Sequence, residues 1–141
     1  MKYLMFLSFC LTLLTACNED GLTTEDDKPC PEMVCTQEFR TVEVIFKDAS
    51  GAAINVNNFS SVIRRTGREP HSGAVDLVNA KGRYNVVTDG DILHLSAGDI
   101  IDVSAVNPST NQTKTAQFVV SGGKCACHIN KISGPTEIRF D

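Results

Sequence analysis

The sequence predicts an all-β fold for residues 29–141: a Greek-key β-sandwich of about seven strands, cross-linked by disulfides. Three observations lead to this prediction. Short runs in which apolar and polar residues alternate recur along the stretch, and no run has the spacing of an amphipathic helix. Turns rich in Gly, Asn and Asp separate these runs. Finally, four cysteines gather near the two ends of the stretch: Cys30, Cys35, Cys125 and Cys127.

The first predicted strand covers residues 41–47, where Val42, Val44 and Phe46 share one face. A turn over 48–51 ends it. Further strands are expected over 62–66, 73–78, 83–87, 100–106, 114–120 and 125–129, with a short apolar segment at 92–95. Three sets of alternating side chains are expected to face the core: Ile101, Val103 and Ala105; Ala116, Phe118 and Val120; Ile138 and Phe140.

The cysteines are interpreted first as disulfides, because an even number in an oxidising compartment favours that chemistry. On a strand, Cys125 and Cys127 point to the same side and diverge too far to bond to each other. The simplest inference is two bridges to Cys30 and Cys35, with a local Cys30–Cys35 bridge as the alternative. Which cysteine pairs with which stays open. Closing a loop of about 90 residues stabilises a fold by about 4 kcal/mol.

Residues 1–16 have the layout of a secretory leader, with Lys2 ahead of an apolar run over 3–14. The run is shorter than the roughly 20 apolar residues that span a membrane. Leu14-Thr15-Ala16-Cys17 resembles the lipobox of bacterial lipoproteins, whose cysteine is acylated. The resemblance implies that Cys17 carries the lipid, and two or more acyl chains make anchoring stable.

Residues 17–28 are predicted to be an acylated cysteine followed by a flexible tether. The segment 18–28 contains five acidic residues, one lysine and almost no apolar residues, so it has too little apolar surface to fold. Asn18 resembles an outer-membrane sorting signal, and Glu19-Asp20 resembles the surface-export signal of Bacteroidetes lipoproteins. We therefore expect a lipid-anchored outer-membrane protein on the cell surface, with the periplasmic face as the alternative.

The segment 47–54, Lys-Asp-Ala-Ser-Gly-Ala-Ala-Ile, follows the first strand and is similar to the opening of transthyretin-like, carboxypeptidase-regulatory-type domains. Ala53 stands where that family usually has proline. The segment 97–103 resembles a later strand of the same family, and the likeness extends over about 39–131. It implies an immunoglobulin-like or transthyretin-like sandwich that serves as a binding or accessory module and brings no catalytic residues.

A metal site is the main alternative for the cysteines. Cys125, Cys127 and His128 offer two soft thiolates and an imidazole, which suit zinc or copper(I). Their spacing is tighter than zinc pairs usually show, and an oxidising compartment removes thiolates. On a strand, His128 also points away from the two cysteines. Disulfides are therefore the favoured interpretation, and no cofactor is expected.

One basic cluster, Arg64, Arg65 and Arg68 with His71, is a candidate for an anionic ligand such as a carboxylate, a sulfate or an anionic glycan. If Arg64 and Arg65 alternate on a strand, they face opposite sides and cannot grip one ligand. Solvated arginines paired with the many acidic residues are the favoured interpretation.

No motif of nucleophile, base and orienting acid is visible, and the histidines at 71, 94 and 128 are scattered, so the prediction is a non-enzymatic protein. The formal net charge is −4, and loss of Lys2 with the leader makes it −5, which argues against a nucleic-acid partner. The predicted function is a binding or accessory module held at the membrane by its lipid, with a protein or glycan ligand. A metal-binding protein or a structural subunit of an envelope assembly is the alternative.

Overall fold

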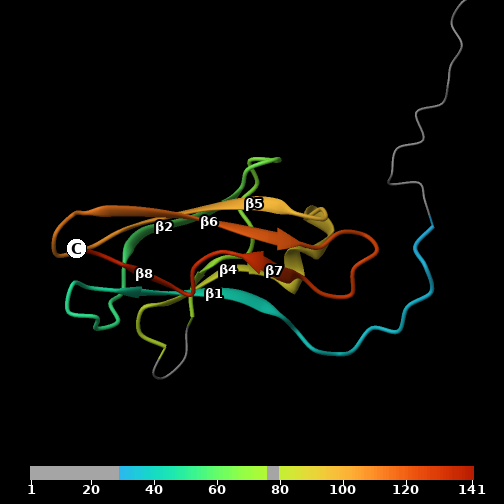
Figure 1. Cartoon of the computed structure of the whole chain (residues 1–141), viewed down its shortest axis with the longest axis horizontal. Coiled ribbons are helices and arrows are strands. Elements are labelled where there is room, and N and C mark those ends of the chain that lie inside the picture. The colour runs from blue at the N-terminus through green and yellow to red at the C-terminus, as the bar shows by residue number, and fades with distance from the viewer. Residues whose placement is uncertain (1–28, 76–79) are drawn as a thin grey trace, which may run out of the picture.

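The computed structural model describes residues 29–75 and 80–141. The predicted leader, Cys17 and the tether at 17–28 lie outside these residues. Eight strands are present in the described part, and they pack as two layers (Figure 1). They are β1 (Thr41–Lys47), β2 (Asn57–Ile63), β3 (Gly73–Ala74), β4 (Arg83–Thr88), β5 (Asp99–Val106), β6 (Thr113–Ser121), β7 (Asn130–Ser133) and β8 (Glu137–Arg139).

Each layer is a four-stranded sheet. The first has the order β3-β4-β1-β8 and the second has the order β2-β5-β6-β7. All neighbouring strands are antiparallel except β1 and β8, which run parallel. The chain crosses between the sheets after β1, β2, β4 and β7. The predicted sandwich is confirmed. β3 lies in the strand expected over 73–78, and β7 and β8, which lie outside the expected strands, bring the number to eight.

The core lies between the sheets and follows the predicted alternation. Every second residue of β1 and of β5 is buried, which confirms the inward faces predicted for these strands. Phe118 and Val120 are buried on β6, whereas Ala116 is only partly buried. Ile138 and Phe140 close the core near the C-terminus, as predicted.

Phe46 is the centre of an aromatic cluster in this core. Its ring centroid lies 5.4 Å from that of Tyr84 and 6.0 Å from that of Phe59, both in edge-to-face contact. Phe140 packs at 6.1 Å. The Tyr84 hydroxyl accepts a hydrogen bond from the backbone N–H of Val56 at 2.8 Å, so its polar end is satisfied although the ring is buried.

The second strand begins earlier than predicted. β2 starts at Asn57 rather than at Val62, and it ends at Ile63, so Arg64 and Arg65 lie in the following turn. Asn58 has a φ of 49°, and the register with β5 shifts between Asn57 and Ser60. This irregularity interrupts the alternation, which is why the start of the strand was not apparent in the sequence.

The segment around 92–95 is helical rather than extended. The 3₁₀-helix η3 (Asp89–His94) begins with Thr88 as its N-cap, whose side chain accepts a hydrogen bond from the N–H of Gly90. The Asp91 side chain accepts a hydrogen bond from the backbone N–H of Thr88 and completes a capping box. His94 is therefore the last residue of this helix.

The expected strand over 125–129 is absent, which corrects the placement of the late cysteines. β6 ends at Ser121, residues 122–129 form a loop, and β7 begins at Asn130. Gly123 has a φ of 109° and its carbonyl oxygen accepts a hydrogen bond from the N–H of Ala126, so the chain turns there.

No helix among the described residues is long and apolar enough to cross a membrane.

Candidate functional site

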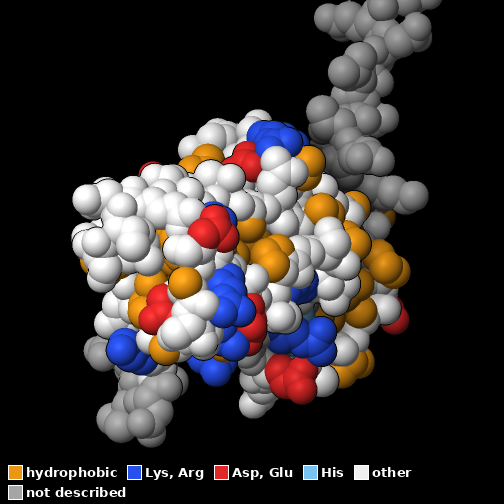
Figure 2. Space-filling view, turned by 60° about the vertical axis from the view of Figure 1, so that its left-hand side comes forward, with side chains coloured by type: hydrophobic (Ala, Val, Ile, Leu, Met, Phe, Trp, Pro, Cys, Tyr) orange, Lys and Arg blue, Asp and Glu red, His pale blue; other side chains and the backbone are white. Residues whose placement is uncertain are grey.

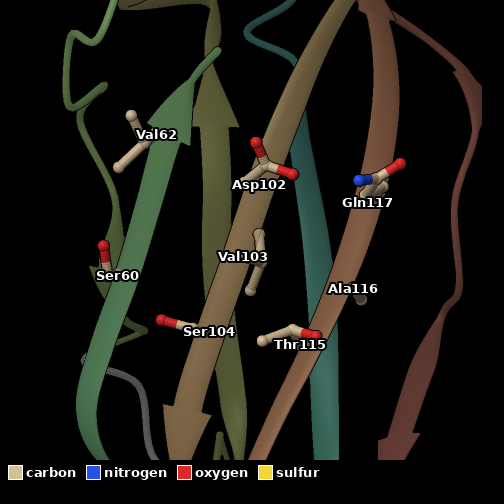
Figure 3. Close-up of a pocket in the computed structure, with 8 residues that line it drawn as sticks. All are labelled: Ser60, Val62, Asp102, Val103, Ser104, Thr115, Ala116 and Gln117. Atoms are coloured by element: carbon tan, nitrogen blue, oxygen red, sulfur yellow. The ribbon is translucent and has the colours of Figure 1, made fainter.

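The outer surface of the second sheet carries a shallow hollow built from three adjacent strands, β2, β5 and β6 (Figure 3). Its volume is about 620 Å³. We call it the outer-face hollow and define it by the residues that line it: Ser60, Val62, Asp102, Val103, Ser104, Thr115, Ala116 and Gln117.

Strand register arranges the outward-facing side chains of the outer-face hollow in two rows. Ser60 lies opposite Ser104, and Ser104 lies opposite Thr115, so three hydroxyl groups stand side by side across the sheet. Next to them, Val62, Asp102 and Gln117 form a second row in the same way. Figure 3 shows both rows. The arrangement offers several hydrogen-bond donors and acceptors on a rigid, nearly flat support.

Arg64 borders the outer-face hollow and forms a two-pronged ion pair with Asp102. Its Nε and Nη2 atoms lie 2.8 Å and 2.6 Å from the two carboxylate oxygens. The guanidinium of Arg64 lowers the pKa of Asp102 through these hydrogen bonds. The carboxylate is therefore charged at neutral pH but is neutralised by its partner, so the hollow presents little net charge.

The basic cluster predicted from the sequence is divided. Arg65 turns away from Arg64 and donates two hydrogen bonds of 2.8 Å to the buried carboxylate of Asp99. Arg68 and His94 lie beside Arg65 along a second, mostly polar depression of about 530 Å³. The favoured interpretation, arginines paired with acidic residues, is confirmed for Arg64 and Arg65.

The two disulfides link Cys30 to Cys125 and Cys35 to Cys127. The inferred bridges between the N-terminal segment and the late cysteines are thus present, and the local Cys30–Cys35 alternative is not. Cys125 and Cys127 are each oxidised in one of these disulfides, so neither is a thiolate. Within residues 29–75 and 80–141 no group of three His, Cys, Asp or Glu side chains is placed to hold a metal ion.

His128 belongs to a hydrogen-bonded chain that the sequence did not reveal. Its Nδ1 atom lies 2.7 Å from a carboxylate oxygen of Asp89, and its Nε2 atom lies 2.9 Å from the hydroxyl oxygen of Thr36. The three residues are far apart in the sequence, and the Cys35–Cys127 bridge joins the residues next to Thr36 and His128. The cysteine pairing was the only signal that could have predicted this contact, and the sequence left it open.

Asp89 is fixed by two backbone groups in addition to His128. The N–H of Arg40 and that of Ile129 each donate to its carboxylate at 2.8 Å. Burial raises the pKa of Asp89, but the hydrogen bonds from these groups and from His128 outweigh that effect and hold it below its ordinary value. The side chains of Asp89 and His128 are each only 10% exposed.

Asp91 is the deepest carboxylate of the described chain and has a structural role. It is fully buried and accepts hydrogen bonds from the backbone N–H and the ring of His71, at 3.0 and 2.8 Å. It also accepts one from the N–H of Thr88. Burial raises the pKa of Asp91, and these hydrogen bonds more than compensate, so the net effect is a lowered pKa.

Acid is expected to destabilise the fold through these carboxylates. Hydrogen bonds from Arg65 lower the pKa of Asp99, and Asp89 and Asp91 are lowered as well. A depressed pKa means that, as the pH falls, the unfolded chain binds protons first, near its ordinary pKa of about 4. The stabilisation is therefore complete above about pH 5 and is lost as the pH falls through the pKa values of the folded state. Urea unfolding midpoints measured from pH 7 to pH 3 should therefore be level and then fall.

The variant Asp99→Asn is the matched comparison for the acid effect. It should be less stable than the wild type at pH 7, because Arg65 loses its carboxylate partner. Its stability should also fall less steeply below pH 5, since one titrating group is gone. Parallel pH profiles for the two proteins would contradict the assignment of Asp99.

Further surface charges of the described residues form ion pairs. Ion pairs join Arg83 to Glu43 and Lys114 to Asp141. On the face that Figure 2 shows, Lys and Arg side chains lie among Asp and Glu side chains. This face has no large area of one charge.

Comparisons with known proteins identify no family for this chain. No family model matches the chain, and neither a curated protein nor a solved structure is significantly similar to it. The resemblances to bacterial lipoproteins and to transthyretin-like domains therefore stay predictions from the sequence.

Proposed function

We propose that this protein is a binding module of the bacterial cell envelope, anchored by lipid on Cys17, that holds its ligand in the outer-face hollow. The hollow is the observation that carries the proposal, because it places three hydroxyl groups, a carboxylate and an amide side by side on one sheet. Two disulfides support an extracytoplasmic location, since such bonds persist in oxidising compartments. The lipobox-like segment 14–17 supports the anchor.

The chemistry of the outer-face hollow favours a neutral glycan. Three hydroxyls and the Gln117 amide can both donate and accept hydrogen bonds, as sugar hydroxyls do. Asp102 accepts further bonds while Arg64 balances its charge. Val62 adds an apolar contact for the C–H face of a sugar ring. An anionic ligand is less suited, because Arg64, which borders the hollow, is already paired with Asp102.

The proposal is tested by applying the purified full chain, with its disulfides intact, to an array of neutral and uronic-acid-containing glycans. We expect binding to a subset of neutral glycans. The variant Ser104→Glu should lose it at least tenfold, because the new carboxylate fills the centre of the hollow. Ser109→Glu makes the same chemical change on an exposed loop residue and should bind like the wild type.

Two outcomes would contradict the proposal. If no neutral glycan binds, the ligand class is wrong. If Ser104→Glu binds as well as Ser109→Glu, the outer-face hollow is not the site. When the chain is expressed in a bacterium, Cys17→Ser should move it from the membrane fraction to the soluble fraction, and protease added to the intact cells should cleave the anchored chain if it faces outward.

A further inference from the structure

Thr36, His128 and Asp89 have the relative positions of a nucleophile, a base and an orienting acid. The lowered pKa of Asp89 keeps it ionised near neutral pH, and a carboxylate only accepts hydrogen bonds. The proton between them is therefore on Nδ1 of His128. In the neutral ring the other nitrogen, Nε2, carries a lone pair, and the Thr36 hydroxyl oxygen lies 2.9 Å from it, within reach to donate its hydrogen.

We propose that Thr36 is a nucleophile for acyl transfer, with His128 as its general base and Asp89 as the positioning residue. The arrangement meets the geometric criterion for an activated hydroxyl, which is a nucleophile–base contact with the base held by a third group. This activity goes beyond ligand binding and does not rest on the outer-face hollow. It also departs from the non-enzymatic protein that the sequence predicts.

The surroundings of the three residues suit this role. Thr36 is exposed in the N-terminal arm, residues 29–40, so an ester can reach its hydroxyl. His128 and Asp89 are shielded, and two backbone N–H groups hold the carboxylate in place. The Cys35–Cys127 bridge joins the residues next to Thr36 and His128. The nucleophile and its base therefore stay together although the arm has little packing of its own.

The reaction is ester hydrolysis in two balanced steps. The Thr36 oxygen attacks the ester carbonyl carbon while its proton passes to Nε2 of His128. The bond to the alcohol then breaks, the alcohol leaves with that proton, and an acyl group remains on Thr36. Water attacks this acyl ester by the same route, releases the carboxylic acid and returns the proton to Thr36. Neither step needs an oxidant, a reductant or a metal.

The substrate class is a small ester with a good leaving group. A threonine oxygen is a secondary alcohol, and its methyl group hinders a bulky acyl chain. General-base assistance contributes about 10²–10⁴-fold, so a reactive ester is the probe that makes the activity measurable. We choose p-nitrophenyl acetate, whose hydrolysis releases a coloured alcohol.

The experiment compares variants of the oxidised full chain with this ester at neutral pH. Thr36→Val keeps the shape of the side chain, and its rate should fall at least tenfold. Thr36→Ser should be several-fold faster than the wild type, because serine is less hindered. A purely structural hydrogen bond would be kept by serine without any gain in rate. Asp89→Asn should lower kcat with little change in KM, because the base loses the partner that fixes its tautomer.

Control measurements separate this activity from the background hydrolysis that any solvent-exposed histidine side chain gives. His71 is paired with Asp91 but has no part in the Thr36 chain, so His71→Gln should hydrolyse the ester like the wild type. Mass spectrometry of the acid-quenched reaction should find one acetyl group on the peptide that contains Thr36. A rate for Thr36→Val equal to that of the wild type, or acetylation confined to other residues, would overturn the proposal.

Discussion

Removal of both disulfides is expected to lower the free energy of unfolding by about 7 kcal/mol, more than the two single removals added together. The bridges enclose almost the same stretch of chain, with sequence separations of 95 and 92 residues. Whichever forms first closes a long loop, worth about 4.5 kcal/mol of chain entropy. The second then closes only the small ring over 30–35 and 125–127, worth about 2.5 kcal/mol.

The double removal is tested with urea unfolding at pH 7. C30S/C125S and C35S/C127S should each lose about 2.5 kcal/mol, because the remaining bridge still closes the long loop. The variant with all four serines should lose about 7 kcal/mol, which is comparable to the whole stability of a small domain. If the cost of the fourfold variant is only the sum of the two double variants, the two loops are not coupled in the way the structure implies.

Phe46→Ala is expected to cost about 3–5 kcal/mol, because it removes the central ring of the aromatic cluster and leaves a cavity between the sheets. The ring is fully buried on β1 and contacts Phe59, Tyr84 and Phe140. The loss should appear as a lower midpoint in thermal and urea unfolding.

Phe39→Ala is the matched control for this prediction. Phe39 lies in the N-terminal arm and is 69% exposed, so the same change of side chain removes little buried surface. Its effect should stay within about 0.5 kcal/mol. Equal losses for the two variants would mean that the core is not organised around Phe46.

Most of the fold could be predicted from the sequence, because burial on a strand repeats every two residues. Val42, Val44 and Phe46 share a face for that reason, and the structure buries all three. The same rule predicted which side chains of β5, and of the last residues of β6, face the core. It failed at β2, where Asn58 breaks the alternation, and at η3, where the short run over 92–95 does not distinguish a strand from a helical turn.

The candidate sites were harder to predict, because they depend on contacts between distant segments. The outer-face hollow depends on register: nothing in the local sequence places Ser60 opposite Ser104 and Thr115. The Thr36–His128–Asp89 chain depends on the disulfide pairing. The strand predicted over 125–129 could not decide which cysteines pair. A loop there lets His128 and Cys127 turn toward different partners.

The double cross-link also determines how a pulling force travels through the molecule. If the proposed ligand is held in the outer-face hollow while the proposed lipid anchor fixes the N-terminal end of the chain, the domain comes under tension. That tension enters at Cys30 and passes through a covalent bond to Cys125, four residues beyond the end of β6. β6 is hydrogen-bonded along its length to β5, and both strands line the hollow. The load therefore reaches the sheet that carries the outer-face hollow directly, and β1 is not pulled away from its neighbours.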